Sequence, residues 1–278
     1  MRKINTLLTK DFVAPRLVGR LGNMMFQIAH AYVMSLEHDR QLVVPKLDSC
    51  SDQFKDTIFR KIDFYIDSTR DVELTKGTFT YCDIIPNNDK PTYIEGYFQS
   101  EKFFKNYSQK VKDLFSPTQQ FLNKVESEYP QFKSSTVAAV NVRRGDYLTF
   151  PNRHPVVTKE FLDHAVTLLP PHDHLLIMSD DLQWCKDNLN YENSFFVEWK
   201  DEMGLWLLSL CDHYVISNST FSWWGAYLSN TPDKTVIVPS TWFGPDMERE
   251  NIVSDDIYCE NWIQVPTKWN NGFIDLIK

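Results

Sequence analysis

The chain has 278 residues, of which 42% are apolar and 24% charged, a composition typical of a globular protein long enough for two domains. A net charge of -8 and a pI near 5.4 exclude a general electrostatic attraction to nucleic acid or to an anionic membrane. Five cysteines without metal-ligand spacing, no apolar signal segment and no apolar run of membrane length predict a reduced, cytoplasmic protein without a transmembrane segment.

The N-terminal half has an irregular pattern of predicted elements. Apolar residues on one face predict a long helix over 21–38, and a short strand is expected at 42–45. A second strand is expected at 92–98 and a second helix over 100–115. A further helix between Pro117 and Pro130 leads into the second half.

From about residue 135, short apolar strands alternate with amphipathic helices. The predicted strands are 136–142, 174–179, 194–199, 213–218 and 235–239, and the predicted helices are 159–169, 180–189, 202–211 and 220–229. This alternation indicates a parallel sheet covered by helices, an α/β, doubly wound, Rossmann-like unit, and there is no GxGxxG for an ordinary dinucleotide. We expect two α/β halves with a cleft between them: residues 1–134, residues 135–262, and a tail, 263–278, that packs back on the domain junction.

Two adjacent arginines follow the first strand of the second half. Asn141, Arg143, Arg144 and Asp146 lie where a parallel sheet presents ligands, beyond the carboxyl end of its strand. A guanidinium stays charged and binds phosphate through two N–H groups, so the pattern favours an anion clamp. An ordinary surface turn with Arg144 paired to Asp146 is the simpler alternative. The tripeptide Arg-Gly-Asp also permits an adhesion loop, although it follows a buried strand.

Two more polar groups follow neighbouring strands. Ser219, Thr220 and Ser222 begin a predicted helix, whose free N–H groups and dipole favour an anion, although simple N-capping explains them equally well. Asp180 and Asp181 either stabilise the dipole of their own helix or accept hydrogen bonds from a guanine or a ribose hydroxyl. The sequence does not separate these alternatives.

Metal binding is disfavoured, because no D-x-D occurs and the histidines show no ligand spacing apart from His172-Asp173-His174. Near the N-terminus, Gly19 and Gly22 flank a turn into the first helix, and Asn23 sits in its first turn. These residues either form a glycine turn before a core helix or let backbone and amide approach a ligand.

Five stretches together resemble the inverting α-1,2-fucosyltransferases of glycosyltransferase family 11. The family motif H-x-R-R-G-D-Y stands here as residues 141–147, and an S-N-S-T-F-S-W-W string is matched by residues 217–224. The S-D-D before a W-C helix is matched by Ser179, Asp180 and Asp181. The opening G-x-L-G-N-Q-M-F-Q is matched over residues 19–27, and the G-Y-F-Q segment over residues 96–99.

The resemblance implies a GT-B-like fold whose C-terminal half binds the nucleotide sugar and whose N-terminal half lies on the acceptor side. It implies inverting transfer of L-fucose from GDP-β-L-fucose to the 2-hydroxyl of a terminal β-galactoside, with no obligatory metal and no cofactor. Arg143 would hold the diphosphate, and Asp146 or Glu95 would take the acceptor proton. The other residues expected to bind the nucleotide sugar are Asn141, Arg144, Asn23, Gly22, Ser179, Asp180, Asn218, Ser219, Thr220, Phe221, Ser222 and Glu202.

Three positions depart from the family pattern. Asn141 replaces a histidine, Met24 a glutamine, and Gly204 an aspartate, for which Glu202 is a possible substitute. The change at Asn141 and Gly204 leaves open a transferase of the same fold that uses another nucleotide sugar. A non-catalytic sugar-binding or adhesion module is the remaining alternative. The expected partners are a nucleotide sugar and a galactose-terminated glycan but no nucleic acid, and the protein would be peripheral to a membrane if that glycan is lipid-linked.

Overall fold

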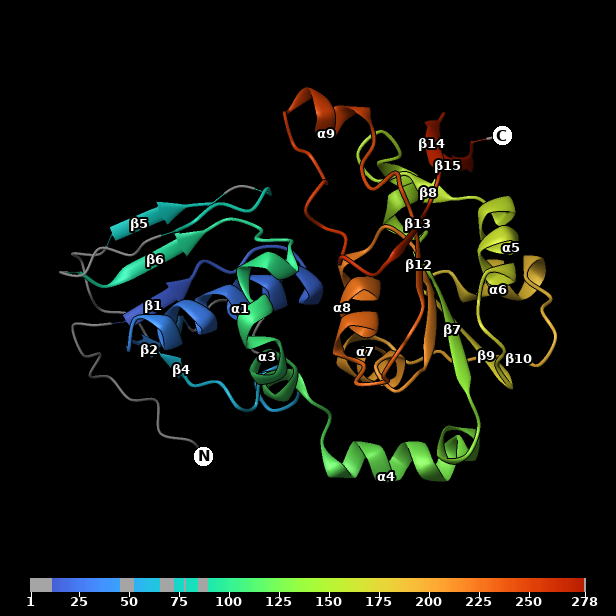
Figure 1. Ribbon diagram of the computed structural model, residues 1–278, viewed down its shortest axis with the longest axis horizontal. Helices are drawn as coiled ribbons and strands as arrows, with labels where there is room; N and C mark the ends of the chain where they lie inside the picture. Colours follow the sequence, from blue (N-terminus) through green and yellow to red (C-terminus); the bar gives the residue numbers. More distant parts are fainter. Residues whose placement is uncertain (1–11, 46–52, 66–72, 78, 85–89, 278) are drawn as a thin grey trace. The chain divides into compact units, whose positions relative to one another are not determined.

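The computed structural model describes residues 12–45, 53–65, 73–77, 79–84 and 90–277, and the chain folds as two units (Figure 1). Unit 1 comprises the chain up to Ser116 together with Asp255–Cys259, and unit 2 comprises Pro117–Ser254 and Glu260–Lys278. Cys50 lies outside the described residues.

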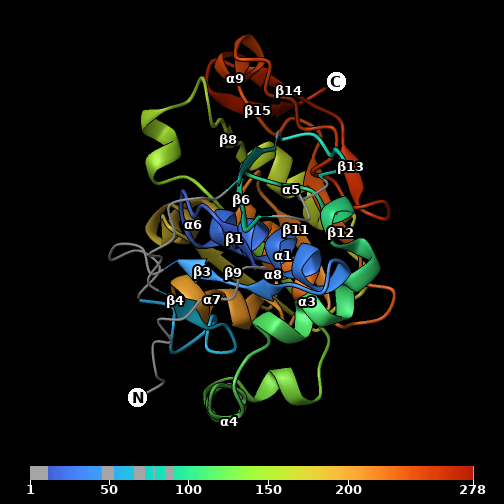
Figure 2. The same cartoon turned by 90° about the vertical axis from the view of Figure 1, so that its left-hand side faces the viewer.

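Unit 1 is built on a parallel sheet with the strand order β2-β1-β6-β5. Its strands are β1 (Phe12–Pro15), β2 (Gln41–Leu42), β5 (Glu73–Lys76) and β6 (Thr92–Glu95), and β3 (Val44–Pro45) pairs separately with β4 (Phe64–Tyr65). Helix α1 (Leu21–Glu37) packs against β1, and the turned view shows α1 with α3 (Ser108–Phe115) beside it (Figure 2).

The strand expected at 92–98 ends at Glu95, and two other predicted elements of unit 1 are divided in the structure. The strand expected at 42–45 is divided between β2 and β3, which pair with different partners. The helix expected over 100–115 is divided into 3-10 turns η1 (Glu101–Phe103) and η2 (Lys105–Tyr107) and the shorter α3. The break falls at Phe104, whose backbone (φ -147°, ψ 10°) is not helical, because Phe103 packs on His30 while Phe104 packs on Phe26.

Unit 2 is a six-stranded parallel sheet with the order β10-β9-β7-β11-β12-β13. The strands are β7 (Val137–Val142), β9 (His174–Ser179), β10 (Ser194–Phe196), β11 (His213–Ile216), β12 (Val236–Pro239) and β13 (Ile263–Val265). Helices α5 (Lys159–Thr167) and α6 (Leu182–Asn188) lie on one face, and α7 (Asp201–Leu208) and α8 (Thr220–Leu228) on the other (Figure 1). This is the doubly wound arrangement that the sequence predicts.

The division of the chain differs from the boundary expected near residue 134. Helix α4 (Gln119–Glu128) and the 3-10 turn η3 (Pro130–Lys133) belong to unit 2, because Phe121 of α4 packs against Trp199 and Trp206. Residues 255–259 belong to unit 1, where the Asp256 carboxylate accepts hydrogen bonds from Lys102 and from the backbone N–H of Tyr81.

The C-terminal residues form sheets of unit 2. Strand β13 extends the main sheet, while β14 (Thr267–Asn270) and β15 (Phe273–Leu276) join β8 (Val156–Val157) in a three-stranded sheet. Between β12 and β13 lies the short helix α9 (Pro245–Arg249). Residues 263–277 are therefore a structural part of unit 2.

Candidate functional site

The carboxyl end of β7 is tied to both of its neighbours through Asn141. This side chain is only 6% exposed, and its Nδ2 donates to the Met178 carbonyl of β9 at 3.3 Å. The Ser222 hydroxyl of α8 donates to Asn141 Oδ1. Because Asn141 is paired in register with Met178 and with Ile216 of β11, the end of the sheet and the start of α8 are held together.

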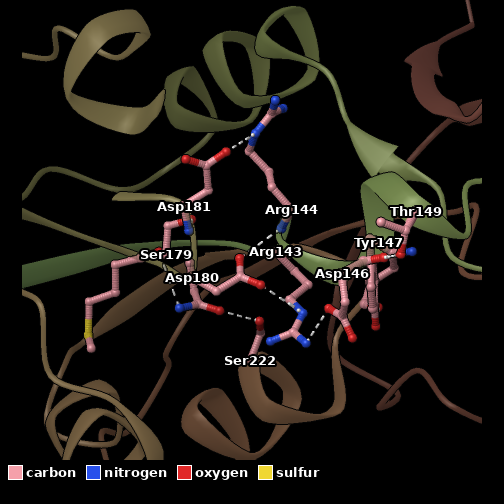
Figure 3. A network of polar contacts seen from close by, with 12 residues as sticks. Arg143, Arg144, Asp146, Tyr147, Thr149, Ser179, Asp180, Asp181 and Ser222 are labelled. Atoms are coloured by element: carbon pink, nitrogen blue, oxygen red, sulfur yellow. Dashed lines mark hydrogen bonds and ion pairs between the residues drawn. The ribbon is translucent and has the colours of Figure 1, made fainter. Parts of the chain in front are cut away.

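Arg143 lies one pleat beyond Asn141, on the side of the sheet that faces α8 (Figure 3). Its Nη2 is 2.5 Å from Asp146 Oδ1, and its Nε is 3.2 Å from Asp180 Oδ2, an ion-pair distance without hydrogen-bond alignment. The guanidinium carbon lies 5.2 Å from the centre of the Tyr147 ring. With a side chain 17% exposed, Arg143 is a partly desolvated cation held on three sides.

Arg144 points in the opposite direction, toward α6 (Figure 3). Its guanidinium carbon lies 3.8 Å from the centre of the Trp184 ring, and its Nε is 3.2 Å from Asp181 Oδ2. The side chain is 10% exposed. The alternative of a surface turn in which Arg144 pairs with Asp146 does not describe the structure, since Asp146 pairs with Arg143 and Arg144 with Asp181.

Asp180 fixes the loop that carries both arginines. Its Oδ1 accepts the backbone N–H of Arg144 at 2.9 Å, while its Oδ2 faces Arg143. A Cβ on Gly145 would lie 2.4 Å from Asp180 Oδ2, so only glycine lets the carboxylate approach the loop this closely. Asp180 therefore does more than stabilise the dipole of helix α6, because its carboxylate contacts the loop that carries Arg143 and Arg144.

The neighbouring acid has the helix-capping role. Asp181 is the N-cap of α6 and accepts the Trp184 N–H at 3.3 Å, and Ser179 Oγ accepts the N–H of Asp181 at 2.9 Å. Ser179 and Asp181 thus shape the turn between β9 and α6.

The start of α8 presents backbone N–H groups without a side-chain cap. Ser219 is the N-cap residue, yet its hydroxyl accepts no hydrogen bond from the helix, so simple capping does not account for it. Thr220 and Phe221, the first two helical residues, are half-buried, and the Ser222 hydroxyl is held by Asn141. The free N–H groups of a helix start carry partial positive charge, which suits an anion.

The segment before α8 is anchored to its surroundings through Asn218. Its Nδ2 donates to the carbonyls of Pro155 at 3.0 Å and Trp242 at 2.8 Å, and its own carbonyl accepts the Tyr147 hydroxyl at 3.2 Å. Tyr147 therefore connects the arginine loop to the start of α8, since its ring also lies beside Arg143. We infer that Asn218 positions this segment through its side chain.

Sequence reasoning missed His154, which stacks on Tyr147 with ring centroids 4.8 Å apart. Burial lowers the pKa of His154, with further lowering from Arg153 and Arg143 and an opposing effect of Asp146. The neutral imidazole is thus favoured beside the arginine loop. No spacing signal in the sequence connects His154 to the arginines.

Gly204 is enclosed by neighbouring atoms. A Cβ there would lie 2.5 Å from the Trp199 carbonyl oxygen and 2.9 Å from Met178 Cε, so a larger residue would need both to move. Glu202 lies in the first turn of the same helix, α7, and is half-buried. The structure shows no contact between Glu202 and the arginine loop among the described residues.

Three of the expected residues belong to unit 1, whereas all the others belong to unit 2. Glu95, at the end of β6, forms an exposed ion pair with Arg16 at 2.8 Å. Asn23 Oδ1 accepts a hydrogen bond from Gln99 Nε2 at 3.0 Å, and Gly22 is buried in the first turn of α1. Within unit 2, the expected residues around the end of β7 lie together.

A turn before α1 depends on one glycine and one glutamine. Gly19 has φ +83°, and a Cβ there would lie 2.3 Å from Asn23 Nδ2. The buried Gln27 holds the same turn through hydrogen bonds to the N–H of Val18 at 3.0 Å and its carbonyl at 3.3 Å. The structure thus gives Gln27 a positioning role that sequence reasoning did not assign.

Across the described residues, no group of three or more histidine, cysteine or acidic side chains has a geometry that could hold a metal ion. Within the same ranges, none of the helices has both the length and the apolar character needed to span a bilayer.

Comparison with known proteins places the chain among sugar transferases. Residues 4–266 match the family model for glycosyl transferase family 11. An α-1,2-colitosyltransferase from Escherichia coli is 27% identical, over 92% of this chain and 99% of that protein. Human galactoside α-(1,2)-fucosyltransferase 1 is 24% identical, over 76% of this chain and 64% of that protein.

A solved structure supports the architecture. The fucosyltransferase NodZ from Bradyrhizobium superposes with a TM-score of 0.54 at 13% identity, over 80% of this chain and 94% of that chain. At this identity the likeness concerns the fold alone, and it confirms the predicted GT-B-like α/β class. The family match confirms the resemblance drawn from the five sequence stretches.

Proposed function

The chain belongs to glycosyl transferase family 11, and we propose that it moves L-fucose from GDP-β-L-fucose to the 2-hydroxyl of a terminal β-galactoside. The observation that carries the proposal is the position of Arg143 at the carboxyl end of β7, on the side that faces the uncapped start of α8. A guanidinium and a helix N-terminus on one edge of a parallel sheet suit a diphosphate. The α-1,2-fucosyltransferase and α-1,2-colitosyltransferase named among the relatives support this linkage.

In the proposed reaction the acceptor 2-hydroxyl oxygen attacks the anomeric carbon of fucose from the face opposite the leaving group. The bond between that carbon and the β-phosphate oxygen breaks, and its electron pair leaves with GDP. Arg143 and the first N–H groups of α8 stabilise this developing charge without rearranging, which is how such groups lower a barrier. Inversion at the anomeric carbon follows from the single displacement.

The hydroxyl proton must pass to a base as the new bond forms. Asp146 is the first candidate because it lies on the arginine loop, and Glu95 of unit 1 is the second. Replacing Asp146 or Glu95 with the corresponding amide would identify the base. The amide variant of the base should lose most turnover, whereas the other variant should keep it. Both variants should still bind GDP.

We propose that no metal ion is required, because Arg143 supplies the positive charge that a divalent cation provides in metal-dependent enzymes. A chelator should leave turnover unchanged, and strong inhibition by EDTA that is reversed by Mg²⁺ would contradict this part of the proposal. We also propose a cytoplasmic location, the compartment in which thiols such as those of the buried Cys185 and Cys211 stay reduced. Burial raises the pKa of Cys185 to about 11, which makes that thiol unreactive.

A colitosyl donor is the second candidate, favoured by the E. coli relative that aligns over nearly its whole length. Colitose is fucose without its 3-hydroxyl, so both donors present the same diphosphate to Arg143. Calorimetric titration with GDP and UDP in the absence of metal, followed by turnover with each GDP-sugar and lactose or type 1 and type 2 galactosides, tests both candidates. Failure to bind GDP, or binding of UDP in its place, would overturn the proposal.

A further inference from the structure

We infer that Asp146 is an exchangeable counter-ion of Arg143, which the diphosphate must displace in order to bind. The inference rests on the proposed function, in that it assumes a diphosphate at Arg143. It assigns different roles to two carboxylates that contact the same guanidinium, Asp146 as the exchanging partner and Asp180 as the fixed one.

The position of Asp146 on the guanidinium carries the first step. A phosphate binds a guanidinium in bidentate fashion, through two N–H groups on one edge. Asp180 faces Nε, whereas Asp146 Oδ1 contacts Nη2, one of the two terminal nitrogens, at 2.5 Å (Figure 3). A diphosphate that uses both terminal nitrogens of Arg143 therefore competes with Asp146 for Nη2.

The surroundings of the two carboxylates decide which of them exchanges. Asp180 is held by the N–H of Arg144 at 2.9 Å and is packed against the backbone of Gly145, so it cannot leave without moving the loop. Asp146 lies in the 3-10 turn η4 (Asp146–Thr149), and its side chain is 38% exposed, compared with 26% for Asp180. Rotation of Asp146 toward water thus costs less than withdrawal of Asp180.

The net charge of the cluster around Arg143 determines which anions can displace Asp146. The two guanidiniums of Arg143 and Arg144 face the three carboxylates of Asp146, Asp180 and Asp181, so this cluster has a formal charge of 2 - 3 = -1. An anion that offers a single weak contact gains little by displacing Asp146. A diphosphate gains two charge-assisted hydrogen bonds at Arg143 as well as the N–H groups of α8. Asp146 thereby favours diphosphates over smaller anions.

Calorimetric titration with GDP and with inorganic pyrophosphate, without metal, tests the inference in the wild-type chain and in D146N and D180N. We expect D146N to bind both ligands about three- to tenfold more tightly, as removal of one competing, partly exposed ion pair implies. D180N should bind them at least about tenfold more weakly, because Arg143 loses its fixed counter-ion and would face an amide NH2 group, while Oδ1 can still accept the Arg144 N–H. The surface variant E128Q removes the same charge from the i,i+4 pair with Lys124 in α4 and should change either affinity less than about twofold.

The signs of the two changes separate the explanations. Unchanged or weaker binding in D146N would overturn the inference, as would equal tightening in D146N and D180N, which would indicate a general effect of negative charge. A thermal melt shows whether D180N is folded; if it is not, the D146N affinities together with the E128Q control decide. Should the wild-type chain bind pyrophosphate but not GDP, the proposed function fails while the exchange at Arg143 is still measured.

Discussion

The buried His30 of unit 1 makes the stability of that unit sensitive to mild acid. His30 lies on α1 between the rings of Phe98 and Phe103, each with its centroid 4.6 Å from the imidazole, and it is 5% exposed. Neither ring nitrogen has a partner in hydrogen-bond geometry among the described residues. Burial lowers the pKa of His30 to about 3, with a small opposing effect of the Phe103 backbone.

The direction of the effect follows from proton linkage. The unfolded chain protonates His30 near its ordinary pKa of 6.5, whereas the folded unit keeps it neutral down to about 3. The unfolded state therefore binds more protons as the pH falls below 6.5, and the free energy of unfolding decreases through that window. Between about pH 7.5 and pH 5.5 the loss from this one group is about 1.4 kcal/mol.

Replacing His30 with phenylalanine keeps a ring between Phe98 and Phe103 and removes the titration. We expect H30F to lose about 1.4 kcal/mol less than the wild type over the same pH interval. H38Q, which alters an exposed histidine at the end of α1, is the matched control and should keep the wild-type response. Equal losses in wild type and H30F would refute the reasoning.

The measurement must follow unit 1 separately. All eight tryptophans lie at residues 184–269, within unit 2, so tryptophan fluorescence reports on that unit. Hydrogen–deuterium exchange of the α1 amides, corrected for the intrinsic effect of pH, gives the opening free energy of unit 1. The fluorescence-detected unfolding of unit 2 should respond to pH equally in wild type and H30F.

Three other substitutions address unit 2. Arg143→Ala should lower turnover at least about 100-fold while leaving fluorescence-detected urea unfolding unchanged, and near-normal turnover would contradict the charge-stabilising role of the guanidinium. Gly204→Ala should cost about 1–3 kcal/mol in the same unfolding assay, because its Cβ would meet the Trp199 carbonyl at 2.5 Å; an unchanged unfolding midpoint would show that the loop relaxes freely. Trp184→Leu removes the ring beneath Arg144 and should cost about 1–2 kcal/mol, yet change GDP affinity less than about threefold; a large loss of affinity would place Arg144 in the binding site.

Much of unit 2 could be predicted because its pattern is local. Strand β9 has the predicted bounds, 174–179, and β7 and α5 start within one residue of theirs, since apolar runs and caps mark these ends. Unit 1 was less predictable. In the sequence, Phe103 and Phe104 both fit a continuous helix. Tertiary contacts divide that helix, because the two rings pack against different residues of α1.

The site shows the same limit. The closeness of Asn141 and Ser222 follows from two parallel strands, β7 and β11, that end side by side, so it was accessible from the sequence. The ion-pair partner of each charged side chain could not be predicted from the sequence, because residues 143–146 and 179–181 offer several equally plausible ion pairs. Short-range packing decides among them, in particular the approach of Asp180 to Gly145.

The different roles of the two arginines follow from the pleat of β7. Side chains alternate across a strand, and Val140 and Val142 belong to the core beneath α5 and α6, whereas Asn141 points to α8. Continuing this alternation by two residues places Arg143 on the α8 side and Arg144 on the α6 side, where Trp184 and Asp181 receive it. An arginine pair at the end of a buried strand therefore presents one guanidinium to each face of the sheet. In the proposed reaction the guanidinium on the α8 side serves the transfer, whereas the other contacts Trp184 and Asp181 of α6 and its cap.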